Sequence, residues 1–569
     1  MKKIVSLLLA VMMLLGTVAA MVSCSAPKDN GAEFDIYLGN EVCDFDPSDY
    51  YADSTAEQVM SLLFEPLFSI NDDGKLELAA AKDYDIDYEK RQIVIELRES
   101  YWSDEVRVCA ADFIYAWCER LLNPNNPNPA AALLYEIENA MDVKSGVGTV
   151  SDIGARATGI DEITITYRDG GDPARLIRNL ASVATAPVRQ DRVEAAPSYW
   201  SKLVDTMVFS GPFAVKAYDT TTGQFSLERN RGYHQSPDSK NFSKQVTPGT
   251  LFNFFTIFGE EMTLTTADIE NKTTFFMTEA PLADRQANKD KAICADSMSA
   301  YSYVFNVQNP LFAIPEVRQA LLISIDRKAI AEALTFAKPA DGVLPDVCGG
   351  SSEQLISSES KLAEAEALLA NVNFTGISKS FSITCANNED EIKIAELVSA
   401  TWKSLGFNVT VKTVGRTLNR VNEVEFYDSR VQALVKEASF GNYQFDVLGI
   451  DWQFYSDDAF TGLAAFTSAM NGCGIDFTAN SQRANIAGYS SLEYDSLIVE
   501  AMKLNGDERA AVLAEAEKLL CTDAAFCPIV FNQSFAFVSE ELRNVEVDAF
   551  GHFVLTEADL KNYEEYLEE

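Results

Sequence analysis

Segments with the period of a strand alternate along the whole chain with segments that have the period of a helix. Apolar and polar residues alternate over residues 93–97, as in a strand with one buried face. Residues 392–405 instead carry apolar side chains at helical spacing, Gly406 stops this helix, and a strand-like stretch follows at 407–412. Residues 416–442 are charged and irregular, so we expect an insertion or a mobile loop there. The pattern predicts a mixed α/β fold.

The length and charge of the chain limit its domain number and its partners. At 569 residues it exceeds what one hydrophobic core organises, so two or three domains are expected. A net charge of -39 disfavours a nucleic-acid partner, because DNA and RNA binding need a basic surface that replaces counterions. Strong negative charge also keeps a protein soluble outside the cell, so the charge alone names no partner.

The N-terminus has the layout of an export signal. Two lysines precede an apolar run over residues 4–22, which is followed by a small residue and Cys24. The end of this run resembles a bacterial lipobox, which implies a signal peptide at 1–23, acylation of Cys24 and a lipidated tether at 24–32. A single uncleaved membrane anchor is the alternative, since about 20 apolar residues just cross a bilayer.

Residues and motifs that carry catalysis or hold metals are scarce. The two histidines, His234 and His552, lie in no recognisable motif, and no zinc, dinucleotide or phosphate-loop signature is present. We therefore predict no enzymatic activity, no metal and no cofactor. Of the ten cysteines, the nine other than Cys24 lack CxxC spacing, so we expect them to be mostly reduced and buried, with Cys521 and Cys527 as the pair to test for a bridge.

Seven short blocks, taken in order, resemble the substrate-binding lipoproteins of oligopeptide-type ABC importers, the extracellular solute-binding proteins of family 5. Two of the more recognisable blocks read PEVRQALLISIDR and FDVLGIDW. Each block alone is weak, but seven in the correct order behind a lipobox form a specific signal, which extends from about residue 33 to residue 566. The blocks are residues 41–47, 63–69, 101–104, 111–121, 210–213 with 227–233, 315–327 and 445–452.

This resemblance implies a two-lobe, type II periplasmic-binding-protein-like α/β fold with an extra α/β domain inserted in the first lobe. In such folds the lobes close over a ligand, which stabilises the closed state. Family members that bind peptides hold the peptide main chain as an added strand. The implied boundaries are 33–55, 180–299 and 526–569 for lobe one, 56–179 for the extra domain and 300–525 for lobe two.

The block that ends at Trp452 resembles the family's ligand-facing strand, but it departs from the family's peptide binders. Tyr455 replaces an Asp that pairs with the peptide amine, and Gly449 replaces an Arg that some members turn to the peptide carboxylate. Acidic residues beside aromatic ones suit a cationic or amine-bearing ligand instead. The alternatives are a solvated acidic loop and a tryptophan that belongs to the core. The candidate binding residues of this segment are Asp451, Trp452, Tyr455, Asp457 and Asp458.

A second set of candidates comes from the start of lobe one. Glu41, Val42 and Cys43 match the family's first-strand segment, which lines the cleft from the other side. Ordinary strand packing is the alternative for these three residues.

The expected function follows from the resemblance. We expect the extracytoplasmic, lipid-anchored substrate-binding component of an ABC importer, at the cell surface or in the periplasm. It would be a monomer that binds a peptide or a small cationic or amine-bearing solute and delivers it to permease and ATPase subunits. The alternatives are an oligosaccharide, opine or metal-chelate ligand in the same fold, a secreted hydrolase, and a surface receptor without transport.

Overall fold

The computed structural model describes residues 33–39, 42–50, 53–234, 251–256, 263–468, 485–556 and 558–562. The predicted signal peptide, the lipidation site Cys24, the tether and the candidate residue Glu41 lie outside these described residues.

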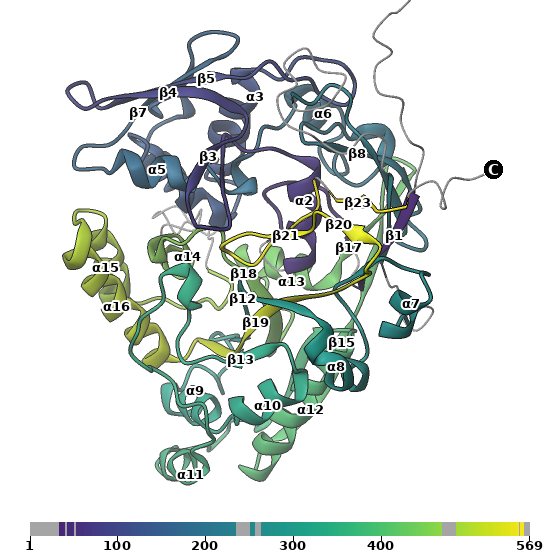
Figure 1. Cartoon of the computed structure of the whole chain (residues 1–569). Coiled ribbons are helices and arrows are strands. Elements are labelled where there is room, and N and C mark those ends of the chain that lie inside the picture. The colour runs from purple at the N-terminus through teal and green to yellow at the C-terminus, as the bar shows by residue number, and fades with distance from the viewer. Residues whose placement is uncertain are drawn as a thin grey trace, which may run out of the picture.

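Among the described residues, eleven strands join into one sheet that runs through both halves of the molecule (Figure 1). The strand order is β15-β14-β18-β12-β19-β11-β1-β10-β9-β8, and β13 pairs with β19 beside this path. The strands are β1 (Glu33–Gly39), β8 (Phe213–Tyr218), β9 (Phe225–Arg229), β10 (Leu251–Thr256), β11 (Phe276–Met277), β12 (Ile293–Phe305), β13 (Ala337–Pro339), β14 (Ser380–Ala386), β15 (Asn408–Val414), β18 (Val447–Gln453) and β19 (Phe526–Val538).

Two long antiparallel strands, β12 and β19, connect the halves of this sheet. One end of β19 pairs with β11, and both strands continue to the region where β12 pairs with β18. Their register shifts between Asp296 and Ala300 of β12, which face Gln533 and Phe531 of β19. Such a bulge bends the strand and redirects its side chains. It therefore places a kink where the two halves meet.

Smaller sheets lie outside the large sheet. The strands β4 (Ala81–Asp87), β5 (Gln92–Leu97), β7 (Glu162–Thr166) and β6 (Ala155–Ala157) form an antiparallel sheet at the top left of Figure 1. The alternating burial of β5 confirms the strand predicted from its period. The remaining two-stranded ladders pair β2 (Phe68–Ile70) with β3 (Leu76–Leu78), β16 (Arg416–Val421) with β17 (Val424–Ser429), β20 (Leu542–Arg543) with β23 (Asp559–Leu560), and β21 (Glu546–Val547) with β22 (Phe553–Val554).

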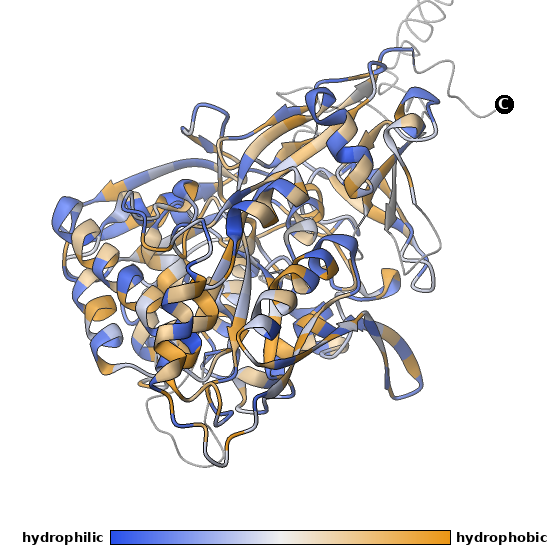
Figure 2. Ribbon diagram, turned by 90° about the horizontal axis from the view of Figure 1, so that it is seen from below, coloured by the Kyte–Doolittle hydropathy of each residue, from blue (hydrophilic) through white to orange (hydrophobic). Residues whose placement is uncertain are grey.

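Helices surround the sheets, and their ribbons mix hydrophilic and hydrophobic positions (Figure 2). Those of the N-terminal half are α2 (Ser54–Leu63), α3 (Ala110–Ile114) with a π-helical continuation (Tyr115–Leu121), α4 (Ala140–Lys144), α5 (Pro173–Asn179), α6 (Gln190–Ala195), α7 (Thr266–Glu270) and α8 (Leu282–Asn288). Those of the C-terminal half are α9 (Pro315–Ile323), α10 (Arg327–Leu334), α11 (Leu362–Ala370), α12 (Glu389–Ser404), α13 (Arg430–Ser439), α14 (Ala459–Ala464), α15 (Leu492–Ala501) and α16 (Gly506–Asp523).

The predicted helix–strand pair near residue 400 is present as α12 and β15. Gly406 lies between them at φ +88°, a conformation that favours glycine. Trp402 anchors α12, because its indole is fully buried against Phe305 and Phe381 and its Nε1 donates to the Leu321 carbonyl at 3.1 Å. The apolar face read from the sequence is thus the face that holds this half together.

The prediction of an irregular loop at 416–442 is wrong. This segment forms the β16–β17 hairpin and then helix α13. The hairpin turns at Asn422 and Glu423, both at positive φ, and Glu is an unusual residue for such a turn. The helix buries one apolar face that includes Leu434 and Val435. Charged residues on the exposed faces obscured both periods in the sequence.

Cys521 and Cys527 form no disulfide bond with each other and are free thiols. Both side chains are buried, and burial raises the pKa of the Cys527 thiol to about 11. In the described part of the chain, no helix has the length and apolar character needed to cross a membrane.

Candidate ligand-binding site

A cavity of about 680 Å³ lies where the long strands pass between the two halves. The end of β1 and the start of α2 line it from the N-terminal half, and the start of α12 lines it from the C-terminal half. Residues of β12, β18 and β19 lie between these walls. We call it the acidic cavity.

The bulge of β12 supplies polar side chains to this cavity. Asn532 of β19 donates to Ser299 Oγ at 2.8 Å and to a carboxylate oxygen of Asp451 at 2.6 Å. Ser297 Oγ lies 3.1 Å from Ser299 Oγ and donates to the Asn532 carbonyl. Strands β12, β18 and β19 therefore share one hydrogen-bond network on the cavity wall.

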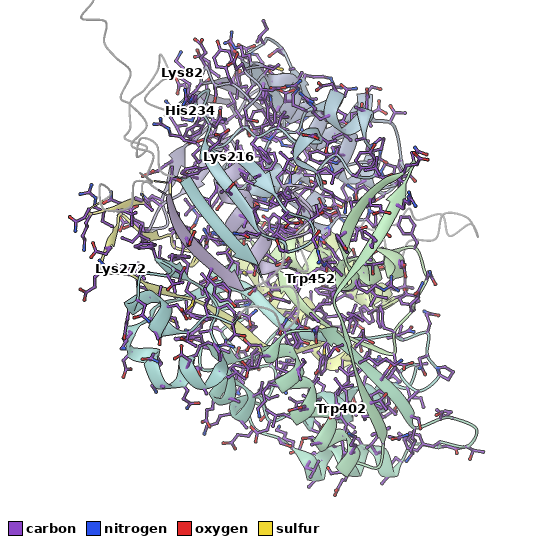
Figure 3. All side chains as sticks on the ribbon, turned by 90° about the vertical axis from the view of Figure 1, so that its right-hand side faces the viewer. Lys82, Lys216, His234, Lys272, Trp402 and Trp452 are labelled. Atoms are coloured by element: carbon purple, nitrogen blue, oxygen red, sulfur yellow. The ribbon has the colours of Figure 1, made fainter. Side chains whose placement is uncertain are left out.

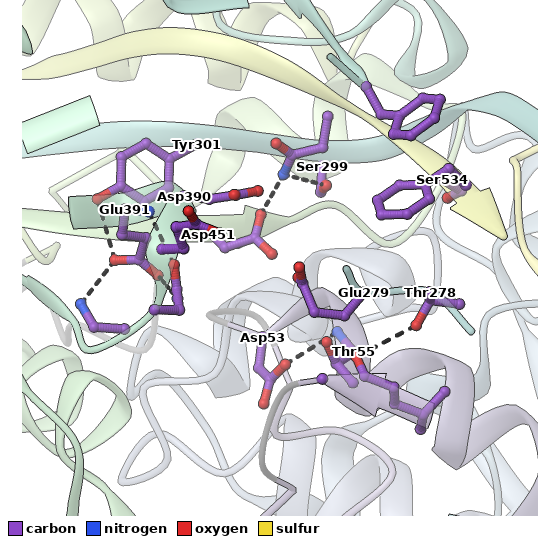
Figure 4. Close-up of a pocket in the computed structure, with 18 of the residues that line it drawn as sticks. Asp53, Thr55, Thr278, Glu279, Ser299, Tyr301, Asp390, Glu391, Asp451 and Ser534 are labelled. Carbon is purple, nitrogen blue, oxygen red and sulfur yellow. Dashed lines mark hydrogen bonds between the residues drawn. The ribbon is translucent and has the colours of Figure 1, made fainter. Parts of the chain in front are cut away.

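Carboxylates outnumber cationic groups in the lining. Of the described residues that line the acidic cavity, seven are acidic, two are arginines and one is a histidine. Figure 4 shows carboxylates from different elements around one open space. Closely spaced carboxylates disfavour one another's charge and attract a cation. The acidic residues are Asp53, Glu57, Glu279, Glu389, Asp390, Glu391 and Asp451.

One of the two arginines is already neutralised by an acidic partner. The side chain of Arg285 is 2 % exposed, and both of its terminal nitrogens bind the Asp390 carboxylate, while Glu279 lies 3.4 Å away. Burial raises the pKa of Glu279 to about 8, against the attraction of Arg285 and with added repulsion from Asp390. Gly39 permits this arrangement, because a Cβ at that position would lie 2.1 Å from the Cβ of Glu279. The Glu279 carboxyl is half-buried, and it shares Arg285 with Asp390.

Glu391 occupies the opposite wall, at the start of α12. Asn388 caps this helix and donates to the Glu391 carboxylate at 3.1 Å, which also accepts from the Ala386 amide at 2.8 Å and the Tyr301 hydroxyl at 3.1 Å. Burial raises the pKa of Glu391 to about 7 despite these donors. The carboxyl pKa is therefore raised on both facing walls, at the half-buried Glu279 and at the buried Glu391.

Comparison with known proteins identifies the family. Residues 75–472 match the family model for bacterial extracellular solute-binding proteins, family 5 Middle. The chain belongs to this family. It is accordingly the substrate-binding component of an ABC importer, as its sequence predicted.

Curated relatives and solved structures agree with this assignment. The chain is 27% identical over 491 residues to the periplasmic murein peptide-binding protein MppA of Escherichia coli K12, covering 83% of this chain and 82% of MppA. It is 25% identical over 516 residues to the periplasmic oligopeptide-binding protein OppA of the same strain, covering 87% and 86%. The solved structure of the Escherichia coli murein tripeptide binding protein MppA matches at a TM-score of 0.76 and 22% identity, covering 93% of this chain and 98% of that one. This likeness confirms the two-lobe α/β fold.

In this family member the three consecutive residues at the end of β18 divide between two faces. Asp451 and Gln453 line the acidic cavity. Trp452 is 2 % exposed, and its ring packs against Phe466 and Phe526 at centroid distances of 5.8 and 6.1 Å, near the centre of the molecule (Figure 3). Neighbouring side chains on a strand point to opposite faces, so Trp452 points away from the cavity that Asp451 lines. The structure places the tryptophan in the core.

Tyr455 and Asp457 lie beyond the strand, on a second cavity of about 420 Å³. The Tyr455 ring meets Tyr50 edge-on at 5.1 Å, and its hydroxyl lies 3.5 Å from the Ser48 carbonyl. Asp457 accepts from Arg178 Nε at 2.6 Å, which joins this segment to the N-terminal half. Both predicted residues therefore border a cavity, although a different one from Asp451.

Asp458 is held by structural contacts. Its side chain caps α14 by accepting from the Phe460 amide, and its two oxygens accept from the guanidinium of Arg509 at 2.6 and 2.9 Å. Such a bidentate pair fixes the carboxylate firmly. Among the lining residues of the two cavities, Asp458 is absent.

The candidates from lobe one are also packed. Val42 and Cys43 are buried, and the Val42 carbonyl accepts from the Tyr218 hydroxyl at 3.1 Å. Neither residue is among those that line the two cavities, while Glu41 is outside the described residues.

The sequence did not reveal Glu279, Arg285 or Glu391 as cavity residues. None of the three belongs to a recognisable motif, and Glu391 lies more than 100 residues along the chain from Glu279 and Arg285. The clue that was available is the capped start of α12, where Asn388 precedes Glu391 by three residues. Within the described residues, no three His, Cys, Asp or Glu side chains group closely enough to hold a metal ion.

Proposed function

We propose that this chain captures a positively charged, amine-bearing solute, a peptide above all, in the acidic cavity and delivers it to an ABC permease without changing it chemically. The names of the two relatives support the peptide class, since both are peptide-binding proteins. The observation that carries the proposal is the excess of seven acidic side chains over three basic ones on the cavity wall.

The electrostatic argument concerns the charge that a ligand would supply. Burying carboxylates together costs free energy, and part of that cost appears here as the raised pKa of Glu279 and of Glu391. An ammonium or guanidinium group that enters the cavity stabilises the ionised carboxylates through charge-assisted hydrogen bonds. Asp451 contributes a carboxylate that Asn532 already orients at 2.6 Å.

Capture also requires that the two lobes close over the ligand. We propose the lobe boundaries that the family implies, which are 33–55, 180–299 and 526–569 for lobe one, 56–179 for the extra domain and 300–525 for lobe two. Ion pairs across these boundaries, such as Arg178 with Asp457 and Arg285 with Asp390, support a closed arrangement. A ligand held by both lobes stabilises that state, because it binds the open state less well.

The location and assembly are part of the same proposal. We propose that residues 1–23 are removed, that Cys24 is acylated, and that the tether at 24–32 holds a monomer on the extracytoplasmic face of the membrane. An acyl chain alone binds a membrane weakly, so a diacylated cysteine is the form expected to hold firmly.

Native mass spectrometry on residues 25–569, purified without denaturation, tests the function. We expect co-purified basic peptides or a single amine-bearing compound, released unchanged on mild unfolding. A bound acidic or neutral compound, or turnover of the released ligand, would contradict the proposal. If the protein carries no ligand, calorimetric titration with basic tripeptides and with polyamines tests the proposed function. Absence of a binding signal from both would contradict the proposal.

A further inference from the structure

The two cavities share part of one wall. Glu57, His552 and Phe553 line both the 680 Å³ acidic cavity and the 420 Å³ second cavity. Glu57 comes from α2, whereas the other two residues come from the C-terminal segment, which runs beside α2 in Figure 1. We call these three side chains the partition.

Charged side chains hold the partition in place. His552 Nδ1 lies 2.9 Å from the Asp548 carboxylate, and its Nε2 lies 3.1 Å from the Glu57 carboxylate. Gln453 of β18 also donates to Glu57. Burial alone would lower the pKa of His552, but Asp548 and Glu57 outweigh it and raise that pKa well above its ordinary value. The imidazole is therefore a cation that bridges two acids between the cavities.

Several features allow this wall to move. The Nε2 atom of His552 is buried but lacks a hydrogen bond of good geometry, so its attraction to Glu57 is poorly aligned. Phe553 belongs to a ladder of only two residues per strand, β21 with β22. Its main chain also exchanges two hydrogen bonds with the Gln58 side chain, which a ligand must break to displace it. Short ladders of this kind open at low free-energy cost. A ligand could displace the partition without unfolding either lobe.

We propose that Glu57, His552 and Phe553 form a movable partition that selects ligands by length. Ligands that fit the acidic cavity bind with the partition in place. Longer ligands must displace it and extend into the second cavity, beside Tyr455 and the Arg178–Asp457 pair. This inference rests on the proposed function, since it assumes a ligand that can be lengthened.

The partition is tested by calorimetric titration with a series of peptides in which one Lys is followed by one to five alanines. In the wild-type protein we expect Kd to rise at least tenfold at the length that exceeds the acidic cavity. The double variant Glu57→Gln/His552→Gln removes both charges and keeps both side chains at about the same size. We expect the rise in Kd at that peptide length to be at least tenfold smaller in this variant than in the wild type. Asp161→Asn/Arg107→Gln is the matched control, because it likewise removes both charges of an ion pair and neither residue lines a cavity.

The outcomes separate the two proposals. A wild-type protein that binds every length equally, or a double variant that keeps the wild-type step, would overturn the partition and leave the proposed function intact. If the wild type binds no peptide of the series, the proposed function fails for peptides and the partition fails with it. If the double variant does not fold, a crystal structure of the wild type with the longest bound peptide decides. That peptide must occupy both cavities with Glu57 and His552 apart, and confinement to one cavity would overturn the inference.

Discussion

Two groups of charged residues lie between the halves of this molecule, and they are built differently. In the first, which we call the ion-pair interface, Lys202 lies 3.0 Å from Asp44 and also pairs with Asp428, while Lys436 pairs with Asp49. Each cation there faces a carboxylate from another element. In the acidic cavity, by contrast, acids outnumber bases by seven to three.

The difference separates closure from recognition. Attraction of Lys202 and Lys436 outweighs burial and lowers the pKa of Asp44, so this charge is stabilised within the folded chain itself. Burial raises the pKa of Glu279 in the cavity to about 8, so that carboxyl is left to be stabilised from outside. Burial also raises the pKa of Asp49 despite its pairing with Lys436, so the contrast rests on charge pairing rather than on pKa alone. We infer that the ion-pair interface holds the halves together and that the acidic cavity takes up a cation.

Breaking the ion-pair interface should have the largest effect. Lys202→Met leaves Asp44 and Asp428 without their shared cation in a largely buried setting, which we expect to cost about 3 kcal/mol of unfolding free energy. Urea denaturation of the ligand-free protein measures this loss. A loss below about 0.5 kcal/mol, the size expected of an exposed pair, would show that the interface does not hold the halves together.

Removing one carboxylate from the acidic cavity should affect binding rather than folding. We expect Asp451→Asn to weaken the binding of a cationic ligand by about 1–3 kcal/mol, because a charge-assisted hydrogen bond is lost. Asp458→Asn is the control, since that carboxylate caps α14 and pairs with Arg509. It should lower the melting temperature and leave Kd unchanged. Equal effects of the two variants on Kd in calorimetry would remove the distinction.

The pH dependence of stability sharpens the comparison further. A raised carboxyl pKa means that the folded state binds the proton of that carboxyl more tightly than the unfolded state does. The folded protein therefore loses stability as pH rises from about 4.3, the ordinary pKa of a Glu side chain, to about 8, the pKa of Glu279 in the folded protein. Glu279→Gln removes the titrating carboxyl, so its stability lacks this pH dependence. As pH rises through that window, we expect the unfolding free energy of the variant to increase relative to that of the wild type by about 1 kcal/mol per pH unit.

Chemical denaturation of both proteins at pH 5, 6, 7 and 8 gives this difference. Parallel pH profiles would contradict the raised pKa. In the wild type, a cationic ligand should also bind more tightly as pH rises to about 8, because binding favours the ionised carboxylate.

An exposed ion pair should show the smallest effect. Lys75 lies 2.7 Å from Asp73 on the surface, with both side chains mostly exposed. We expect Lys75→Met to change the unfolding free energy by less than about 0.5 kcal/mol. A change as large as that of Lys202→Met would mean that charge number, rather than burial and pairing, controls stability.

Local patterns predicted much of the fold. The periods of β5 and α12 were legible in the sequence because each element buries one regular face. The β16–β17 hairpin was missed because its strands mix charged and apolar residues and its turn lacks the usual glycine. Family resemblance, rather than period, supplied the two-lobe arrangement.

The binding site was predictable in smaller part. Asp451 was identified from its block, and strand alternation would have placed Trp452 on the opposite face. Glu279 and Glu391 line the same cavity because β12 and β19 pass between the halves, an arrangement that no local pattern encodes. Ion pairing likewise decides the role of Asp458, and its partner Arg509 is 51 residues away.

The most direct test of the acidic cavity compares one ligand with its neutral counterpart. Calorimetry at pH 8 would measure Kd for Lys-Ala-Ala and for acetyl-Gln-Ala-Ala, which lacks both ammonium groups. We expect the cationic peptide to bind at least tenfold more tightly, and this ratio to fall in Glu279→Gln and Asp451→Asn. Equal affinity for the two peptides, or tighter binding of the neutral one, would contradict the account.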